Sequence, residues 1–138
     1  MLQLADTTAW HLSRRVAELR GPFVQKTVSG GIGTCPIVTL ELLQSARNGR
    51  EFDERRSEMG ELPQFPIAAR EFSRALDIYR ELAHQGGSHQ RSVGHADLLI
   101  AAAAESAGVE LLHYDEDFDR IAAITGQPTR WIVPRGSI

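Results

Sequence analysis

Cysteine and lysine are each present only once in the 138 residues of the chain. The single cysteine, Cys35, excludes an intramolecular disulfide framework and a zinc site built from cysteine thiolates. No apolar run reaches the roughly 18 residues that a membrane span needs, and the N-terminus lacks the basic start and long apolar middle of a signal peptide. We therefore expect a cytoplasmic protein with no membrane partner.

The cations are fourteen arginines and one lysine, Lys26, and the net charge of −3 excludes a basic nucleic-acid coat protein. Arginine suits bidentate binding of phosphate or carboxylate, although a GC-rich genome would give the same bias. Two groups of cations are each typical of a solvated helix face, with a phosphate-binding track as the alternative. They are Arg14, Arg15, Arg20 and Lys26, and Arg47, Arg50, Arg55 and Arg56.

Short apolar segments alternate with helical patterns along the chain. Strands are predicted over residues 1–6, 35–38, 109–115 and 129–133. Helices are predicted over residues 7–19, from residue 39, within 48–66, and over 67–85, 97–107 and 116–125. This alternation predicts an α/β fold, a three-layer α/β/α sandwich with a mainly parallel sheet. We expect residues 1–138 to form a single domain.

The strongest amphipathic pattern lies in residues 67–85, before the glycine pair Gly86 and Gly87. Apolar residues recur there at intervals of three and four, which is the spacing of one helix face. The residues that share this face are Ala69, Phe72, Leu76, Tyr79 and Leu82.

Carboxylates follow the predicted strands. Asp6 comes at the end of the first strand, Glu41 just past the second, and Asp115 at the end of the third. Asp97 stands at the head of the apolar helix in GHADLLIAAAAES, residues 94–106. Because ligands of open α/β sheets bind outside the carboxyl ends of the strands, we expect the four acids to meet at one sheet edge.

Each acid also has a purely structural explanation. Asp6 and Asp97 could be helix N-caps, Glu41 could interact with a helix dipole, and Asp115 could belong to a solvated turn. Packed together, four carboxylates would raise one another's pKa unless a cation neutralised them. A set rich in oxygen and poor in histidine suits Mg²⁺ or Mn²⁺, which would explain a carboxylate at the head of a buried helix.

Four motifs, in order, resemble the PIN-domain ribonucleases, specifically the VapC toxins of bacterial toxin–antitoxin pairs. They are LADTTAW with Asp6, PIVTLELLQSAR with Glu41, HADLLIAAAAESAG with Asp97, and LLHYDEDFDRIA with Asp115. The resemblance spans nearly the whole chain. Two positions depart from the family pattern: Ala96, where proline is usual, and His113, where threonine or serine is common near the metal site. We interpret His113 as a structural residue outside the site.

The resemblance implies a metal-dependent endoribonuclease that hydrolyses structured RNA, typically a transfer RNA or a ribosomal RNA loop. It also implies a homodimer and a cognate VapB-type antitoxin whose tail blocks the site. We assign catalysis to Asp6, Glu41, Asp97 and Asp115, with Asp6, Asp97 and Asp115 as metal ligands. Asp117 is a further candidate ligand on the same turn.

Other α/β proteins that gather acids around Mg²⁺ fit less well. A phospho-accepting receiver domain needs a lysine after its last strand, whereas the only lysine is Lys26. A haloacid-dehalogenase phosphatase needs a second aspartate two residues after the first, where this chain has Thr8. A non-catalytic nucleic-acid or protein binding module on the same fold stays as the alternative, and the presence of all four acids argues against it.

Overall fold

The computed structural model describes residues 1–87 and 89–138, with residues 89 and 90 as backbone only. At its centre lies a four-stranded sheet in the order β2–β1–β3–β4, in which every neighbouring pair is parallel. The strands are β1 (Gln3–Ala5), β2 (Ile32–Gly33), β3 (Glu110–His113) and β4 (Thr129–Trp131). The register places Leu4 of β1 opposite Gly33 of β2 and Leu111 of β3.

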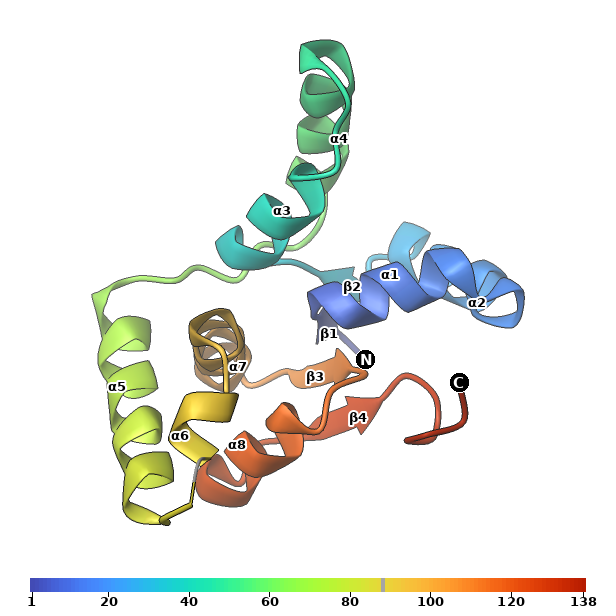
Figure 1. Cartoon of the computed structure of the whole chain (residues 1–138). Helices are drawn as coiled ribbons and strands as arrows, with labels where there is room; N and C mark the ends of the chain where they lie inside the picture. Colours follow the sequence, from blue (N-terminus) through green and yellow to red (C-terminus); the bar gives the residue numbers. More distant parts are fainter. Residues whose placement is uncertain (88) are drawn as a thin grey trace.

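Helices cover both faces of this sheet (Figure 1). They are α1 (Thr7–Arg15), α2 (Ala17–Val28), α3 (Pro36–Leu43), α4 (Gly49–Gly60), α5 (Ala69–His84), α6 (His89–Ser92), α7 (His95–Ala107) and α8 (Asp117–Thr125). Helices α1 and α2 lie on one face, while α7, α5 and α8 lie on the other, which confirms the predicted three-layer α/β/α sandwich. None of the described helices is long and apolar enough to cross a membrane.

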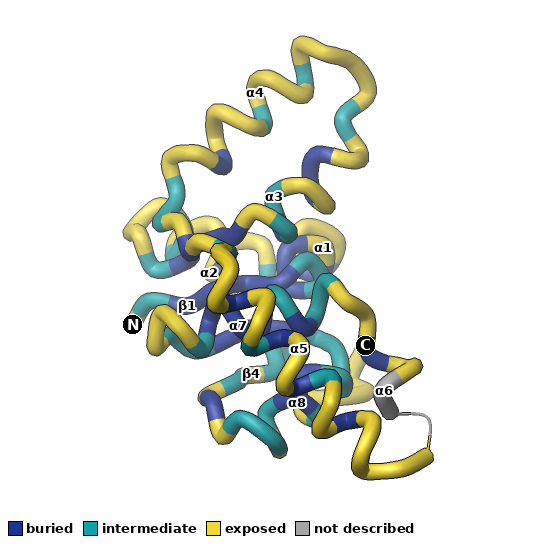
Figure 2. Tube along the Cα trace, turned by 90° about the vertical axis from the view of Figure 1, so that its left-hand side faces the viewer, coloured by how far each residue is buried: buried dark blue, intermediate teal, exposed yellow. Residues whose placement is uncertain are grey.

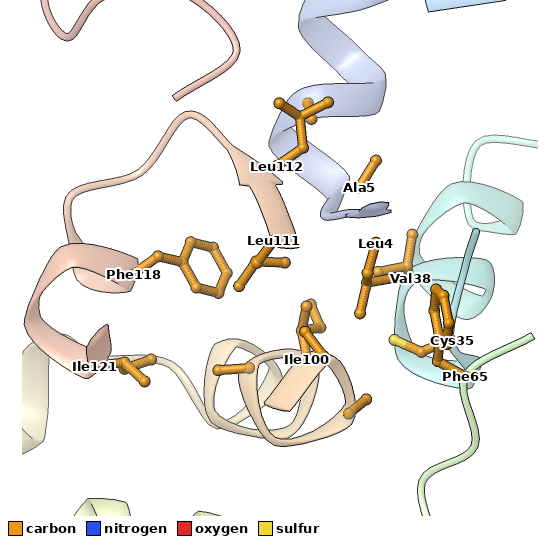
Figure 3. Packing of buried hydrophobic residues seen from close by; sticks show 14 of the residues in the cluster. Leu4, Ala5, Cys35, Val38, Phe65, Ile100, Leu111, Leu112, Phe118 and Ile121 are labelled. Carbon is orange, nitrogen blue, oxygen red and sulfur yellow. The ribbon is translucent and has the colours of Figure 1, made fainter. Parts of the chain in front are cut away.

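The core fills both faces of the sheet because successive strand residues point to opposite sides. Figure 3 shows Leu4 and Leu111 directed towards Ile100 of α7, and Ala5 and Leu112 on the side of α1. The alanines at 101–104 are all buried, and small side chains let α7 approach the sheet closely. Helix α4 is mostly exposed and stands away from the sheet (Figure 2).

Two predictions of local structure are wrong. Residues 35–38, predicted as a strand, open into helix α3, and the strand is the two-residue β2 that precedes them. Pro36 occupies the first turn of α3, where its fixed φ and missing N–H suit a helix start. The helix predicted over 7–19 is two helices, because the chain turns at Val16 between α1 and α2.

Helix α5 forms as predicted but buries a different face. Its buried residues are Glu71, Ala75, Ile78 and Leu82. Of the predicted apolar face only Leu82 is fully buried, whereas Phe72 is 53% and Leu76 is 68% exposed. An apolar strip of α5 therefore lies at the surface.

Candidate metal and catalytic site

The predicted acids meet at the carboxyl end of the parallel sheet. Asp6 follows β1 directly, Asp97 lies in the first turn of α7, and Asp115 lies just beyond β3. Asp97, Asp115 and Asp117 each offer a carboxylate oxygen, and these three oxygens all lie within 4.8 Å of one another. The charges of Asp6 and Glu41 also act on Asp97, so the structure brings together acids that are up to 111 positions apart in the sequence.

Asp6 is held by the helix that it caps. Its Oδ1 accepts a hydrogen bond from the Ala9 N–H at 2.9 Å, which confirms a capping role. The Thr8 hydroxyl lies 2.7 and 2.8 Å from the two carboxylate oxygens of Asp6, and the Tyr114 N–H donates to the same hydroxyl at 2.8 Å. Despite these donors, burial raises the pKa of Asp6 to about 6. The capping role and a metal-binding role are compatible, because the cap uses one oxygen.

Asp97 is the acid whose negative charge is least compensated by hydrogen-bond donors. Helix α7 begins at His95 with Gly94 as its N-cap, so the alternative interpretation of Asp97 as an N-cap is wrong. Within the described parts of the chain, no side chain or N–H donates a hydrogen bond to the Asp97 carboxylate. Burial, followed by the charge of Asp115, raises the pKa of Asp97 to about 7. A cation beside this carboxylate would favour its charged form.

Asp115 and Asp117 form the third part of the cluster. The Asp117 N–H donates to Oδ1 of Asp115 at 2.9 Å, so that one turn presents both side chains. Arg120 contacts Oδ1 of Asp117 at 2.6 Å, and burial together with the Asp115 charge raises the pKa of Asp117 above its usual value. The closest group of carboxylates therefore consists of Asp97, Asp115 and Asp117. The sequence left open whether Asp117 belongs to the site.

Glu41 lies at the rim. It is exposed on α3 rather than at a strand end, and its Oε1 accepts a hydrogen bond from the Thr7 hydroxyl at 2.7 Å. Its charge contributes to the raised pKa of Asp97, behind the charges of Asp115, Asp6 and Asp117. The structure therefore places Glu41 beside the cluster and outside its closest group.

Two threonines support the acids and were missed in the sequence. Thr7 binds Glu41, and Thr8 binds Asp6 while accepting the Tyr114 amide. The only sequence signal was their position immediately after Asp6, and hydroxyls at a helix start are too common to indicate such a role.

A buried acid with a structural role looks different in this protein. Glu71 is 1% exposed, yet it accepts hydrogen bonds from the Ala68 N–H and the Ser106 hydroxyl and pairs with Arg70. These donors lower its pKa, the Ala68 N–H most strongly. By contrast, the cluster around Asp97 has too few donors for its charge, and its all-oxygen donor set fits a hard divalent cation.

Comparison with known proteins assigns the family. Residues 4–124 match the family model of the PIN domain. Ribonuclease VapC18 of Mycobacterium tuberculosis is 47% identical over the full length of both chains. The chain belongs to the VapC family of PIN-domain ribonucleases. Ribonuclease VapC51 of the same organism is 41% identical over 128 residues, which are 89% of this chain and 91% of that protein.

Solved structures share the fold of this VapC-family chain. The DNA-bound VapBC of Salmonella typhimurium has a TM-score of 0.72 at 21% identity and covers 96% of this chain and 100% of that chain. VapBC-1 of nontypeable Haemophilus influenzae has a TM-score of 0.73 at 18% identity, with 96% and 98% covered. At these identities the likeness shows the fold alone. The predicted family, fold and class of toxin endoribonuclease are confirmed, the family and class by the relatives and the PIN match.

Proposed function

We propose that this chain hydrolyses structured RNA, a transfer RNA or a ribosomal RNA loop, with Mg²⁺ or Mn²⁺ held by Asp6, Asp97 and Asp115 and by Asp117 as a fourth ligand. The observation that supports the site is the group of three carboxylate oxygens within 4.8 Å of one another, one of them on Asp97, which receives no hydrogen bond from the described residues. Such a group is unfavourable without a cation.

A bound divalent ion would lower the pKa of a water molecule and shield the charge of the phosphate. The protein side chains would supply orientation and proton transfer. Thr8 holds the Asp6 carboxylate against the end of β3, and Thr7 holds one oxygen of Glu41. Glu41 is the carboxylate best placed to accept a proton from the attacking water, since it is exposed to solvent beside the closest group of acids.

Metal-dependent cleavage separates this function from a non-catalytic binding module. Purified protein should cut a mixture of transfer and ribosomal RNAs with Mg²⁺ and should not cut it with EDTA. An Asp97→Asn variant that binds the same RNA but does not cut it is the matched control. Equal cleavage by this variant, or RNA binding without cleavage by the wild type under every metal condition, would contradict the proposal.

The proposed macromolecular partner that regulates this site is a VapB-type antitoxin. The support is that several of the solved structures with this fold are VapBC complexes. Because the site is a cluster of carboxylates, the antitoxin segment that blocks it should carry an arginine or lysine. A cytoplasmic location would follow from the RNA substrate and stays a prediction.

We further propose a homodimer that forms through the apolar surface between α5 and α7. A surface cavity of about 340 Å³ lies there, and the exposed side chains of Phe72 and Leu76 line it together with Leu99. The cavity also reaches His95 and Leu98, which flank the Asp97 turn. A second copy bound here by a two-fold axis would bring the two acidic sites near each other, so we prefer a second copy to an unrelated partner.

A further inference from the structure

His113 occupies a position that packing alone does not explain. It ends β3, is 0% exposed, and its ring lies 5.1 Å from the ring of Phe118 and 5.0 Å from that of Trp131. In such an apolar enclosure a leucine or phenylalanine would pack without any polar group to satisfy.

The two ring nitrogens of His113 have different environments. Nδ1 accepts a hydrogen bond from the Asp115 N–H at 3.1 Å, which assigns the ring proton to Nε2. Nε2 is fully buried and has no hydrogen-bond partner among the described residues. A buried N–H without an acceptor is unfavourable, so the protein retains this histidine at a cost. The hydrogen bond that Nδ1 accepts from the Asp115 N–H is the interaction that offsets this cost.

The hydrogen bond from the Asp115 N–H to His113 lies at the point where the strand pairing of β3 ends. Beyond His113 the chain is held by side-chain acceptors: the Tyr114 N–H donates to Thr8, the Asp115 N–H to His113, and the Asp117 N–H to Asp115. Together with the backbone bond from the Phe118 N–H to the Asp115 carbonyl at 3.1 Å, these three bonds hold the turn that carries two carboxylates of the closest group. Because those carboxylates repel each other and Asp97, the turn needs a fixed backbone to present them together.

We propose that His113 is a positioning residue of the metal site, which holds the Asp115 amide through Nδ1 and so sets the turn that presents Asp115 and Asp117. This inference rests on the metal site proposed above. Groups that orient metal ligands from outside the coordination sphere commonly change metal affinity 10- to 100-fold when they are replaced.

Variants of His113 separate the bond from the packing. Asparagine places Oδ1 the same number of bonds from Cα as Nδ1, so His113→Asn keeps an acceptor for the Asp115 amide. His113→Leu fills the space and removes the acceptor. Phe118→Leu is the matched control, because Phe118 is equally buried and contacts the same ring, while its side chain makes no hydrogen bond to the turn. Its backbone N–H donates to the Asp115 carbonyl at 3.1 Å, and the substitution leaves this backbone bond in place.

The experiment measures amide hydrogen exchange of Asp115 by NMR in metal-free protein, and Mn²⁺ affinity by calorimetry. For His113→Leu we expect Asp115 exchange at least 10-fold faster and Mn²⁺ affinity about 10-fold weaker. His113→Asn should stay close to wild type, and Phe118→Leu should lose stability without either change. Wild-type exchange and affinity in His113→Leu would overturn the proposal.

Two further outcomes concern a His113→Leu variant that does not fold and a wild type that does not bind Mn²⁺. If His113→Leu does not fold, His113→Gln replaces it, since its acceptor lies one bond further out; affinity and exchange equal to those of His113→Asn would then overturn the inference. If the wild type binds no Mn²⁺, the proposed metal function fails by itself. Faster Asp115 exchange in His113→Leu would still support the positioning of the turn, and unchanged exchange would overturn it.

Discussion

The Thr8 hydroxyl lies 2.7 Å from one oxygen of Asp6 and 2.8 Å from the other, from within the helix that Asp6 itself caps. The same hydroxyl accepts the Tyr114 N–H just beyond β3. One side chain thereby fixes the first acid and joins it to the strand that leads to Asp115. Asp6 is therefore both a cap and a candidate ligand, and the two roles can be separated by substitution.

Asparagine at position 6 should keep the cap and remove the charge. Asp6→Asn can still accept the Ala9 N–H, so its metal-free stability should equal or exceed that of the wild type, while Mn²⁺ binding weakens at least 10-fold. Asp6→Ala should weaken Mn²⁺ binding as well and also lose about 1 kcal/mol of cap stability. Urea unfolding in EDTA measures the difference. Equal losses of stability in both variants would show that the carboxylate charge itself stabilises the fold.

The metal-free protein should become less stable as the pH rises. The pKa of Asp97 is raised from 3.8 to about 7, and that of Asp6 from 3.8 to about 6, chiefly by burial. Between the unfolded pKa of 3.8 and the raised pKa of the folded protein, the folded state binds more protons than the unfolded state. The unfolding free energy therefore falls as the pH rises from about 4 to about 7. One pKa unit corresponds to about 1.4 kcal/mol. After allowance for partial exposure, the unfolding free energy of Asp97→Asn should exceed that of the wild type by about 2 kcal/mol at pH 8 in EDTA.

Urea midpoints at pH 5 and pH 8, with EDTA or with saturating Mg²⁺, measure this dependence. Mg²⁺ should remove most of the loss in the wild type, and Asp97→Asn should show a smaller loss in EDTA. A wild-type stability that does not change between the two pH values in EDTA would contradict the raised pKa values.

The positions of Asp6 and Asp115 could be predicted from the sequence because both follow parallel strands, whose carboxyl ends share one edge. The position of Glu41 could not, since the β-prone Ile37 and Val38 suggested a strand where Pro36 starts a helix. Helical periodicity likewise did not reveal which side of α5 faces the core. Glu71 is buried there because the Ser106 hydroxyl of α7 and the Ala68 amide satisfy it, and such tertiary partners are not visible in a pattern of apolar residues.

Arg14 should contribute more to RNA binding than Arg50. On α4, Arg50 already pairs with Glu54 at 3.1 Å, which agrees with a solvated helix face. Arg14 has no ion pair within the described residues and lies 5.8 Å from the centre of the Trp10 ring. Arg14→Ala should therefore reduce the slope of the logarithm of the RNA-binding constant against the logarithm of salt concentration by about one unit. Arg50→Ala should change this slope less.

Fluorescence titration of labelled RNA at several salt concentrations gives the slope, and an inactive Asp97→Asn background prevents cleavage during the measurement. Equal slopes for Arg14→Ala and its parent would place this arginine outside the RNA-binding surface.

Leu76 should hold the homodimer together. Its side chain is 68% exposed on the apolar surface between α5 and α7, so Leu76→Asp would place a charge in the proposed interface. Val28→Asp is the matched control, because Val28 is 82% exposed on α2 and outside that surface. Sedimentation at micromolar concentration should show a dimer for the wild type and Val28→Asp, and a monomer for Leu76→Asp. A monomeric wild type, or a dimeric Leu76→Asp, would contradict the proposed interface.

Calorimetric titration of Mn²⁺ at pH 6.5 in two buffers of different ionisation enthalpy tests the central claim most directly. A cation that binds among these acids must displace protons, because burial raises the pKa of Asp97 to about 7. The wild type should bind Mn²⁺ and release protons. Asp97→Asn should bind at least 10-fold more weakly and release fewer protons. Absence of Mn²⁺ binding to the wild type, or equal affinity and proton release in the variant, would contradict a metal site at this cluster.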